Sequence, residues 1–201
     1  MNAPALRVST IVTGRKNSGS RVSYLLAPDG GGEQRATPET VVLKRWRQRR
    51  MESHTFAGSR LSSTIWRALA FALPDVLQKG TAPSESEMKE RIQAVQGAMK
   101  RRHLSLPSVE VLRPLLLDLG PDRLRRLVER HMSVLPRGRS GVPDLYLFAR
   151  SVHSLDKGPA FSRFVEVKKP KEKVSKDQEA EIAFMQSLGL QARVLRLIER
   201  G

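Results

Sequence analysis

The fold is decided by two short stretches, SGVPDLYLF at residues 140–148 and RFVEVKKP at residues 163–170. In both, apolar side chains alternate with other residues, which is the pattern of a β-strand that places one face on a core. The connector LDKGPAFS, residues 155–162, is rich in turn-forming residues. The two strands are therefore expected to pair as a hairpin, entered through a Gly/Pro loop.

Charged residues occupy unusual places in both strands. Asp144 follows a proline at the start of the first strand, and Glu166 and Lys168 stand two apart in the second, opposite the flanking valines. In a hairpin, Asp144 would lie beside them. A Glu-x-Lys pair alone is most simply a solvated strand face. Two carboxylates and an amine at one sheet edge are, however, the minimum set for metal-assisted phosphodiester cleavage, with Mg²⁺ or Mn²⁺ as the cation and the carbonyl of Val167 as a further ligand.

The net charge of the chain points to a polyanionic partner. In 201 residues, 36 Lys and Arg stand against 20 Asp and Glu, a formal charge of +16. A surplus of this size favours nucleic acid first and an anionic membrane surface second. Because the basic residues form several clusters, they predict a folded surface lined with phosphate contacts, not a basic arm. The clusters are Lys44–Arg50, Lys100–Arg102, Arg123–Arg130 and Lys168–Lys173.

Other features of the composition exclude several classes of protein. The chain has no cysteine, which excludes disulfides and thiolate metal sites and allows a reducing compartment. No apolar run approaches the ~20 residues of a membrane span. The N-terminus lacks the basic start of a signal peptide, and the histidines show no ligand spacing. The chain is expected to be soluble and intracellular, in the cytoplasm or nucleoid if bacterial, with no membrane partner.

The chain divides into three segments by its composition and its expected secondary structure. Residues 1–36 are expected to form a β-hairpin over 5–27 and then a flexible Gly-rich loop over 28–36. Residues 37–135 read as a helical segment that packs on the C-terminal core. Residues 136–201 read as strand, connector, strand, helix and strand, and form the expected catalytic core. All three segments are expected to make one compact domain.

Capping residues mark where helices begin. Thr37 precedes a proline at the first helical position. Ser84 with Glu87, and Ser175 with Gln178, each have the spacing of a capping box. The cap alone is sufficient to explain Gln178. The spacing of the residues alone therefore favours a structural role for Gln178.

The full string of motifs resembles the VRR-NUC branch of the PD-(D/E)xK nucleases over about residues 138–198. That branch has a Gly-x-Pro-Asp-Leu entry, a strand with a hydrophobic residue before Glu-Val-Lys, and a helix carrying Ser-x-x-Gln. A PD…ExK core alone is a weak signal, whereas the full string with the glutamine helix is strong. The matching residues are Gly141, Pro143, Asp144, Leu145, Glu166, Val167, Lys168, Ser175 and Gln178.

This resemblance implies a fold, a chemistry and a set of site residues. The implied fold is a restriction-endonuclease-like mixed α/β sheet flanked by helices, and the implied activity is Mg²⁺- or Mn²⁺-dependent DNA cleavage. Asp144, Glu166, Lys168 and Gln178 would be catalytic. The metal would be held by Asp144, Glu166 and the backbone carbonyl of Val167. For Gln178, the catalytic and capping roles can coexist.

A weaker resemblance extends upstream. Residues 37–77 are similar to the nuclease region of the Fanconi-associated nuclease and its bacterial relatives, here in a minimal version. In those relatives a Glu-Gly-Ser turn supplies an additional metal ligand. Ala57 stands where that glutamate is expected, and Glu52 substitutes for it only if the turn is remodelled. The number of metals, one or two, therefore stays open.

The main hypothesis is a structure-selective DNA nuclease, endonucleolytic at flaps, junctions or ends. The first alternative is a non-catalytic or weakly active DNA-binding protein on the same fold, favoured by Ala57. The second is a four-way-junction resolvase that acts as a dimer, so a homodimer is an open prediction. Trp46 and Trp66 are expected to pack in the core more than to stack on bases. The residues expected to contact DNA phosphates are Arg137, Arg139, Lys169, Lys171 and Lys173.

Overall fold

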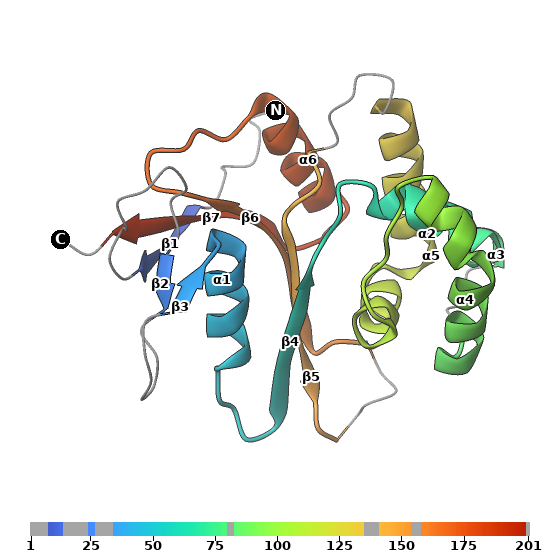
Figure 1. Ribbon diagram of the computed structural model, residues 1–201, viewed down its shortest axis with the longest axis horizontal. Coiled ribbons are helices and arrows are strands. Elements are labelled where there is room, and N and C mark those ends of the chain that lie inside the picture. The colour runs from blue at the N-terminus through green and yellow to red at the C-terminus, as the bar shows by residue number, and fades with distance from the viewer. Residues whose placement is uncertain are drawn as a thin grey trace.

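The computed structural model places seven strands and six helices in the part of the chain that it describes (Figure 1). The described residues are 8–13, 24–26, 34–79, 83–134, 141–153 and 158–199. The strands are β1 (Val8–Thr13), β2 (Tyr24–Leu26), β3 (Gln34–Ala36), β4 (His54–Arg60), β5 (Leu145–Ser151), β6 (Phe161–Lys168) and β7 (Ala192–Glu199). The helices are α1 (Pro38–Arg47), α2 (Ile65–Ala72), α3 (Pro74–Lys79), α4 (Glu85–Arg101), α5 (Val109–Val134) and α6 (Lys176–Ser187).

The central element is a five-stranded mixed sheet in the order β1-β7-β6-β5-β4. β1 and β6 both run parallel to β7, whereas β5 runs antiparallel to β6 and to β4. The predicted hairpin of β5 and β6 is confirmed, with Leu145 opposite Val165. The predicted mixed α/β sheet flanked by helices is therefore the observed fold. The division of the chain into three segments at residues 36 and 135 stays a prediction. The five-stranded sheet includes strands from all three segments.

The predicted N-terminal hairpin over residues 5–27 is wrong in its pairing. β1 joins β7 in the main sheet, and β2 pairs with β3 in a separate two-stranded sheet. The physical reason is that β7 offers β1 six paired positions, from Val8 opposite Val194 to Thr13 opposite Glu199. β2 is only three residues long. Most of the loop predicted over 28–36 lies outside the described residues.

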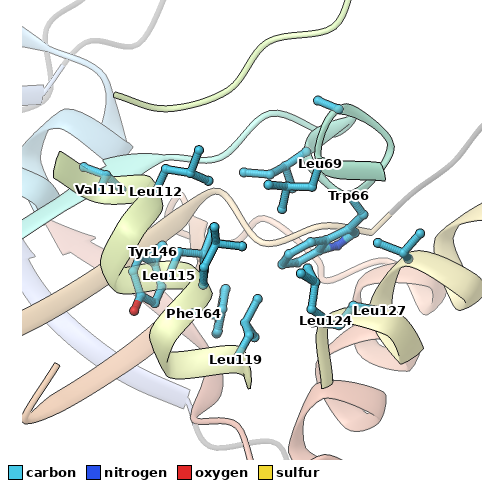
Figure 2. Close-up of a cluster of buried hydrophobic side chains, with 14 of the residues drawn as sticks. Trp66, Leu69, Val111, Leu112, Leu115, Leu119, Leu124, Leu127, Tyr146 and Phe164 are labelled. Atoms are coloured by element: carbon cyan, nitrogen blue, oxygen red, sulfur yellow. The ribbon is translucent and has the colours of Figure 1, made fainter. Parts of the chain in front are cut away.

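The two faces of the sheet are covered by different helices. In Figure 1, α1 lies on one side of β4 and β5, and α2, α3, α4 and α5 gather on the other. Tyr146, Phe148 and Phe164 point into the larger core, formed with α2 to α6. Figure 2 shows this core, where Trp66 from α2 and the leucines of α5 meet Tyr146 and Phe164. Val165 and Val167 belong to the smaller core on the opposite face, so the predicted alternation along β6 is confirmed.

The opposite face forms a smaller core with α1. Leu145, Leu147 and Val165 pack there against Val42 and Trp46. Trp46 is 4% exposed and Trp66 is fully buried, so both tryptophans lie in the core as predicted. The indole Nε1 of Trp46 also donates hydrogen bonds to the carbonyls of Ala57 and Phe148, which fixes α1 on the sheet.

The predicted helix starts are also found. Thr37 caps α1, and complete capping boxes open α4 at Ser84 and α6 at Ser175. α5 holds two helical stretches joined at Gly120, whose φ of 64° and ψ of 174° are not helical. Among the described residues, no helix has the length and apolar character needed to cross a membrane.

Candidate active site

The predicted site residues meet at one pocket of about 240 Å³, where the start of β5 lies beside the end of β6. We call it the carboxylate pocket. It also receives residues from the first turn of α1 and from the loop between β6 and α6. Its lining residues are Pro38, Glu39, Asp144, Glu166, Val167, Lys168, Lys169, Glu172 and Gln178.

Asp144 is held in place through both its backbone and its side chain. Its carbonyl accepts a hydrogen bond from the N–H of Leu61 at 2.8 Å, which ties it to the end of β4. Its Oδ2 accepts one from the N–H of Val167, also at 2.8 Å. Upstream, Gly141 has a φ of 58° and lies so close to α6 that a Cβ would sit 2.5 Å from the carbonyl oxygen of Asp177. Glycine at this position allows the entry loop to pass α6 and deliver Asp144.

Glu166 and Lys168 form a buried pair. Glu166 is 2% exposed and Lys168 is 5% exposed. The Nζ of Lys168 lies 2.8 Å from Oε1 of Glu166, and the side-chain amide of Gln178 donates to the same oxygen at 2.5 Å. Oε2 of Glu166 is buried and has no hydrogen-bond partner among the described residues. The alternative of a solvated strand face does not hold, because both charges are enclosed.

Burial and like charge shift the pKa values of both carboxyls upward. Burial, together with repulsion from Asp144, raises the pKa of Glu166 to about 7. Burial also raises the pKa of Asp144, against the hydrogen bond from Val167 that lowers it. For Lys168, burial acts to lower the pKa, but the hydrogen bond and charge of Glu166 outweigh it, so the pKa is raised overall. The site thus holds carboxyls whose ionised forms are disfavoured by burial, and a lysine that keeps its proton.

The structure adds Glu39, which the sequence analysis did not single out. Glu39 lies in the first turn of α1 and lines the carboxylate pocket, where its charge raises the pKa of Asp144. Its Oε2 is 3.6 Å from Nη2 of Arg60, and that guanidinium also bonds the hydroxyls of Thr37 and Thr40. The helix start at Thr37 was readable from sequence. The sequence did not show that the start of this helix approaches β6, because that contact depends on tertiary packing.

Glu172 is a second addition. Its Oε1 lies 3.5 Å from the Nζ of Lys168, and its Oε2 accepts a hydrogen bond from the N–H of Lys169. It follows the Glu-x-Lys motif by four residues, so proximity along the chain was an available signal. It is exposed, unlike Glu166.

The expected relation of Ala57 and Glu52 to the metal site needs correction. Residues 54–60 form strand β4, not a turn, and Ala57 packs half-buried against the larger core opposite Phe148. Glu52 is exposed and precedes β4 at the end that pairs with Ser151, six strand positions from the Leu145 end. At ~3.4 Å per residue that is roughly 20 Å. Glu52 is therefore not a ligand beside Asp144 in this structure, and a third carboxylate comes from α1 instead.

The predicted phosphate-contacting residues fall into two groups. Arg137 and Arg139 lie outside the described residues. Lys169, Lys171 and Lys173 are exposed on the loop between β6 and α6, and Lys169 lines the carboxylate pocket. This loop therefore places positive charge at the mouth of the pocket.

The residues of the pocket fit a divalent cation. Among the described residues the buried Oε2 of Glu166 has no hydrogen-bond partner, and Asp144 and Glu166 are hard oxygen donors whose pKa values are raised by burial and by neighbouring carboxylates. Within the described ranges, no three His, Asp or Glu side chains are gathered closely enough to form a ready metal site. The fit therefore rests on two carboxylates, with Glu39 across the pocket.

The mixed sheet, its helices on both faces and the pocket where β5 begins and β6 ends define a restriction-endonuclease-like nuclease fold. The model of the VRR-NUC domain matches residues 86–197, more than half of the chain, and the chain belongs to that family.

Solved structures with the same fold support this assignment. Crystal structures of paFAN1 bound to 5′-flap DNA with a gap are similar, with TM-scores of 0.56 for the 1-nucleotide flap and 0.62 for the 2-nucleotide flap. Each is 16% identical over all of this chain, which spans 39% of the paFAN1 chain. None of the curated proteins matches the chain significantly in sequence.

Proposed function

We propose that this protein is a divalent-metal-dependent DNA nuclease that hydrolyses phosphodiester bonds at flaps, junctions or ends. The observation that carries the proposal is that Asp144, Glu166 and Lys168 line one pocket, with one oxygen of Glu166 buried and without a hydrogen-bond partner among the described residues. A structural ion pair would use Lys168 and Glu166 alone. It would not need a second carboxylate beside them, which raises the pKa of Glu166.

The cation is proposed to be Mg²⁺ or Mn²⁺, because both prefer oxygen ligands and keep bound waters. Asp144, Glu166 and the carbonyl of Val167 would hold it, with Glu39 as a further carboxylate. When bound, such a metal neutralises the scissile phosphate and lowers the pKa of the attacking water.

The protein's own side chains prepare the reaction in specific ways. Lys168 keeps its proton, since Glu166 raises its pKa, so it is suited to orient water and to stabilise negative charge on the phosphate. Gln178 donates to Oε1 of Glu166 and so fixes the orientation of that carboxylate, leaving Oε2 for the metal. The N–H of Val167 fixes Asp144 in the same way.

Two observations support DNA as the substrate. The formal charge of +16 favours a polyanion, and Lys169, Lys171 and Lys173 are exposed beside the pocket. The similar paFAN1 chains were crystallised with 5′-flap DNA. We extend that substrate class to this chain as part of the proposal. Phosphate contacts would supply affinity without base specificity, and affinity would fall steeply with salt.

The proposal is tested with labelled duplex, 5′-flap, single-stranded and four-way-junction DNAs in Mg²⁺, Mn²⁺ or EDTA. Wild type is expected to cut flap DNA with metal and not in EDTA. Asp144→Asn and Lys168→Ala are expected to lose at least about 100-fold in rate, while their binding to DNA in EDTA stays close to that of wild type. Asp122→Asn and Lys100→Ala make the same changes at exposed positions away from the pocket and serve as matched controls.

Each possible result has a distinct meaning. Cleavage by Asp144→Asn at the wild-type rate would overturn the proposed site. If none of the DNAs is cut in Mg²⁺ or Mn²⁺ while DNA binding is intact, the result would instead favour a DNA-binding protein on a nuclease fold. Paired nicks across the four-way junction would identify a resolvase.

A further inference from the structure

A hollow of about 490 Å³ lies where α1 leads into β4, at the opposite end of both elements from the carboxylate pocket. We call it the basic hollow. Figure 1 shows α1 alongside β4, with the loop that joins them at the lower end of the pair. The lining of the hollow includes Arg47, Arg49, Arg50 and His54, with Glu52 as an acidic member.

The arginines of the basic hollow are held by contacts that do not neutralise their charge. Nη2 of Arg47 donates a hydrogen bond to the carbonyl of Gly58 at 2.7 Å. The guanidinium carbon of Arg49 lies 4.7 Å from the centroid of the Trp46 ring. In the ion pairs formed among the described residues, none of the three arginines takes part. The hollow therefore presents ordered positive charge.

The dipole of α1 explains only part of this charge. Cations are favoured in the last turn of a helix, and the last turn of α1 is basic. Arg49 and Arg50, however, come after the C-cap residue Gln48 and so lie beyond the helix. Positive charge gathered in a concave surface favours an anionic ligand.

The distance between the basic hollow and the carboxylate pocket can be measured along two elements. Glu39 lines the carboxylate pocket and Arg47 lines the hollow, eight residues apart on α1, which is about 12 Å of helix. On the sheet, His54 pairs with Ser151, six strand positions from Leu145, which is roughly 20 Å. Duplex DNA rises ~3.4 Å per base pair, so this span corresponds to about four to six base pairs.

Basic side chains also lie between the two ends. Lys44 and Arg47 follow Thr40 by four and seven residues, which places all three along one side of α1. The hydroxyl of Thr40 accepts a hydrogen bond from Arg60, whose guanidinium also pairs with Glu39 at the carboxylate pocket. Cationic groups therefore accompany α1 from the carboxylate pocket to the basic hollow.

We propose that the basic hollow binds the phosphate backbone of duplex DNA about four to six base pairs from the scissile phosphate. The inference rests on the proposed function and adds a second contact that senses the length of a duplex arm. A phosphodiester in the carboxylate pocket places the next part of the duplex along α1, which favours DNA over an acidic peptide as the ligand. Contacts to phosphates position a duplex without reading its bases. Arms that end before the hollow would lose this contact and bind more weakly.

The test uses a flap DNA in which two neighbouring phosphates at a time are replaced by uncharged methylphosphonates, over about ten base pairs of each duplex arm. Binding is measured by fluorescence anisotropy in EDTA over a range of salt, for wild type and for Arg49→Gln/Arg50→Gln. The matched control is Arg101→Gln/Arg102→Gln, which also removes two adjacent exposed arginines at the end of a helix, one of them 4.5 Å from an aromatic ring. Arg47 is retained because it bonds the backbone of β4. Thermal unfolding verifies that both variants are folded.

Wild type is expected to lose affinity at two positions of one arm, about four to six base pairs apart. The hollow variant should bind unmodified DNA about tenfold more weakly, with a salt slope lower by about two. It should also be insensitive to methylphosphonates at one of the two positions, whereas the control variant should respond at both. A hollow variant that responds at both positions, or that has an unchanged salt slope, would overturn the inference.

The result is independent of cleavage, because binding is measured without metal. A wild type that cuts none of the DNAs but shows both positions, one of them lost in the hollow variant, would count against the proposed function. The inference about the basic hollow would then stand.

Discussion

The side-chain amide of Gln178 joins Glu166 to the start of α6. Its nitrogen donates to Oε1 of Glu166 at 2.5 Å, and its oxygen accepts the N–H of Ser175 at 3.0 Å. The capping role and the site role of this glutamine therefore coexist in one residue. Because the cap fixes the amide, the orientation of Glu166 depends on the local structure of the helix start.

Gln178→Glu separates these two roles. A glutamate retains the capping oxygen but loses the donor to Glu166 and adds a negative charge near it. We expect cleavage to fall by about 10- to 100-fold while the thermal stability changes little. Ser175→Ala is the matched control, since it removes the cap at a cost of about 1 kcal/mol and leaves the donor present. If the two variants have equal cleavage rates, the amide of Gln178 acts only as a cap.

Glu39→Gln tests the third carboxylate. The substitution keeps the size of the side chain and removes a charge that faces Asp144 across the pocket. We expect weaker activation by Mg²⁺, seen as a higher metal concentration at half-maximal cleavage, by about tenfold. Glu52→Gln changes an exposed carboxylate beyond the end of β4 that is far from Asp144, and it is expected to leave the metal titration unchanged. Identical titrations for Glu39→Gln and wild type would remove Glu39 from the ligand set.

Ala57→Glu asks whether a carboxylate on β4 can join the site. Ala57 packs half-buried against the larger core, so the new carboxylate would enter an apolar environment. We expect a loss of about 2 kcal/mol in the free energy of unfolding and no gain in cleavage. Thr55→Glu introduces the same side chain at an exposed position of the same strand as a control. A more active, equally stable Ala57→Glu protein would show that β4 does face the metal.

Gly141→Ala probes the entry loop. A Cβ there would meet the carbonyl of Asp177 at 2.5 Å, in a backbone conformation with φ of 58°. We expect destabilisation by more than about 1 kcal/mol and lower cleavage, because either α6 or Asp144 must shift. Gly97→Ala in α4 is the contrasting variant, since its Cβ has space and alanine stabilises helices by up to about 1 kcal/mol. Chemical denaturation measures both, and equal stability of the two variants would contradict the prediction.

The burial of His131 predicts that the folded protein loses stability in acid. It is 4% exposed on α5, and burial, followed by the nearby charge of Arg67, lowers its pKa below the ordinary value. The unfolded chain therefore binds a proton more readily, and stability falls as the pH drops from ~6.5 toward the folded-state pKa. In His131→Gln, melting temperature should decline less between pH 7.5 and 5.5, by roughly 2–4 °C for each kcal/mol. Parallel declines in both proteins would show that His131 is not the group responsible.

The parts of the site that are close in sequence were predictable. The hairpin of β5 and β6 and the cap at Ser175 follow from alternation and from residue types within a few positions. These elements bring Asp144, Glu166, Lys168 and Gln178 together, so the main site residues could be placed without a structure.

The contacts that sequence reasoning missed are formed between distant segments. Glu39 reaches the pocket because Trp46 and Val42 pack α1 on the sheet, a contact that no local pattern encodes. In the same way, β-propensity identified strands near residues 8 and 24 but not their partners, since β1 pairs with β7. The assignment of Ala57 to a turn failed because β4 is an edge strand whose partner, β5, lies far along the chain.

The pairing of β1 with β7 has a consequence for biosynthesis. Val8 can form its ladder only after Val194 has been translated, and β7 is also the parallel partner of the strand that carries Glu166. Contacts of such long sequence separation slow folding, because the loop must close before they are made. On the ribosome, the strand that carries Glu166 would therefore gain this parallel neighbour only after residues 192–196 have been synthesised.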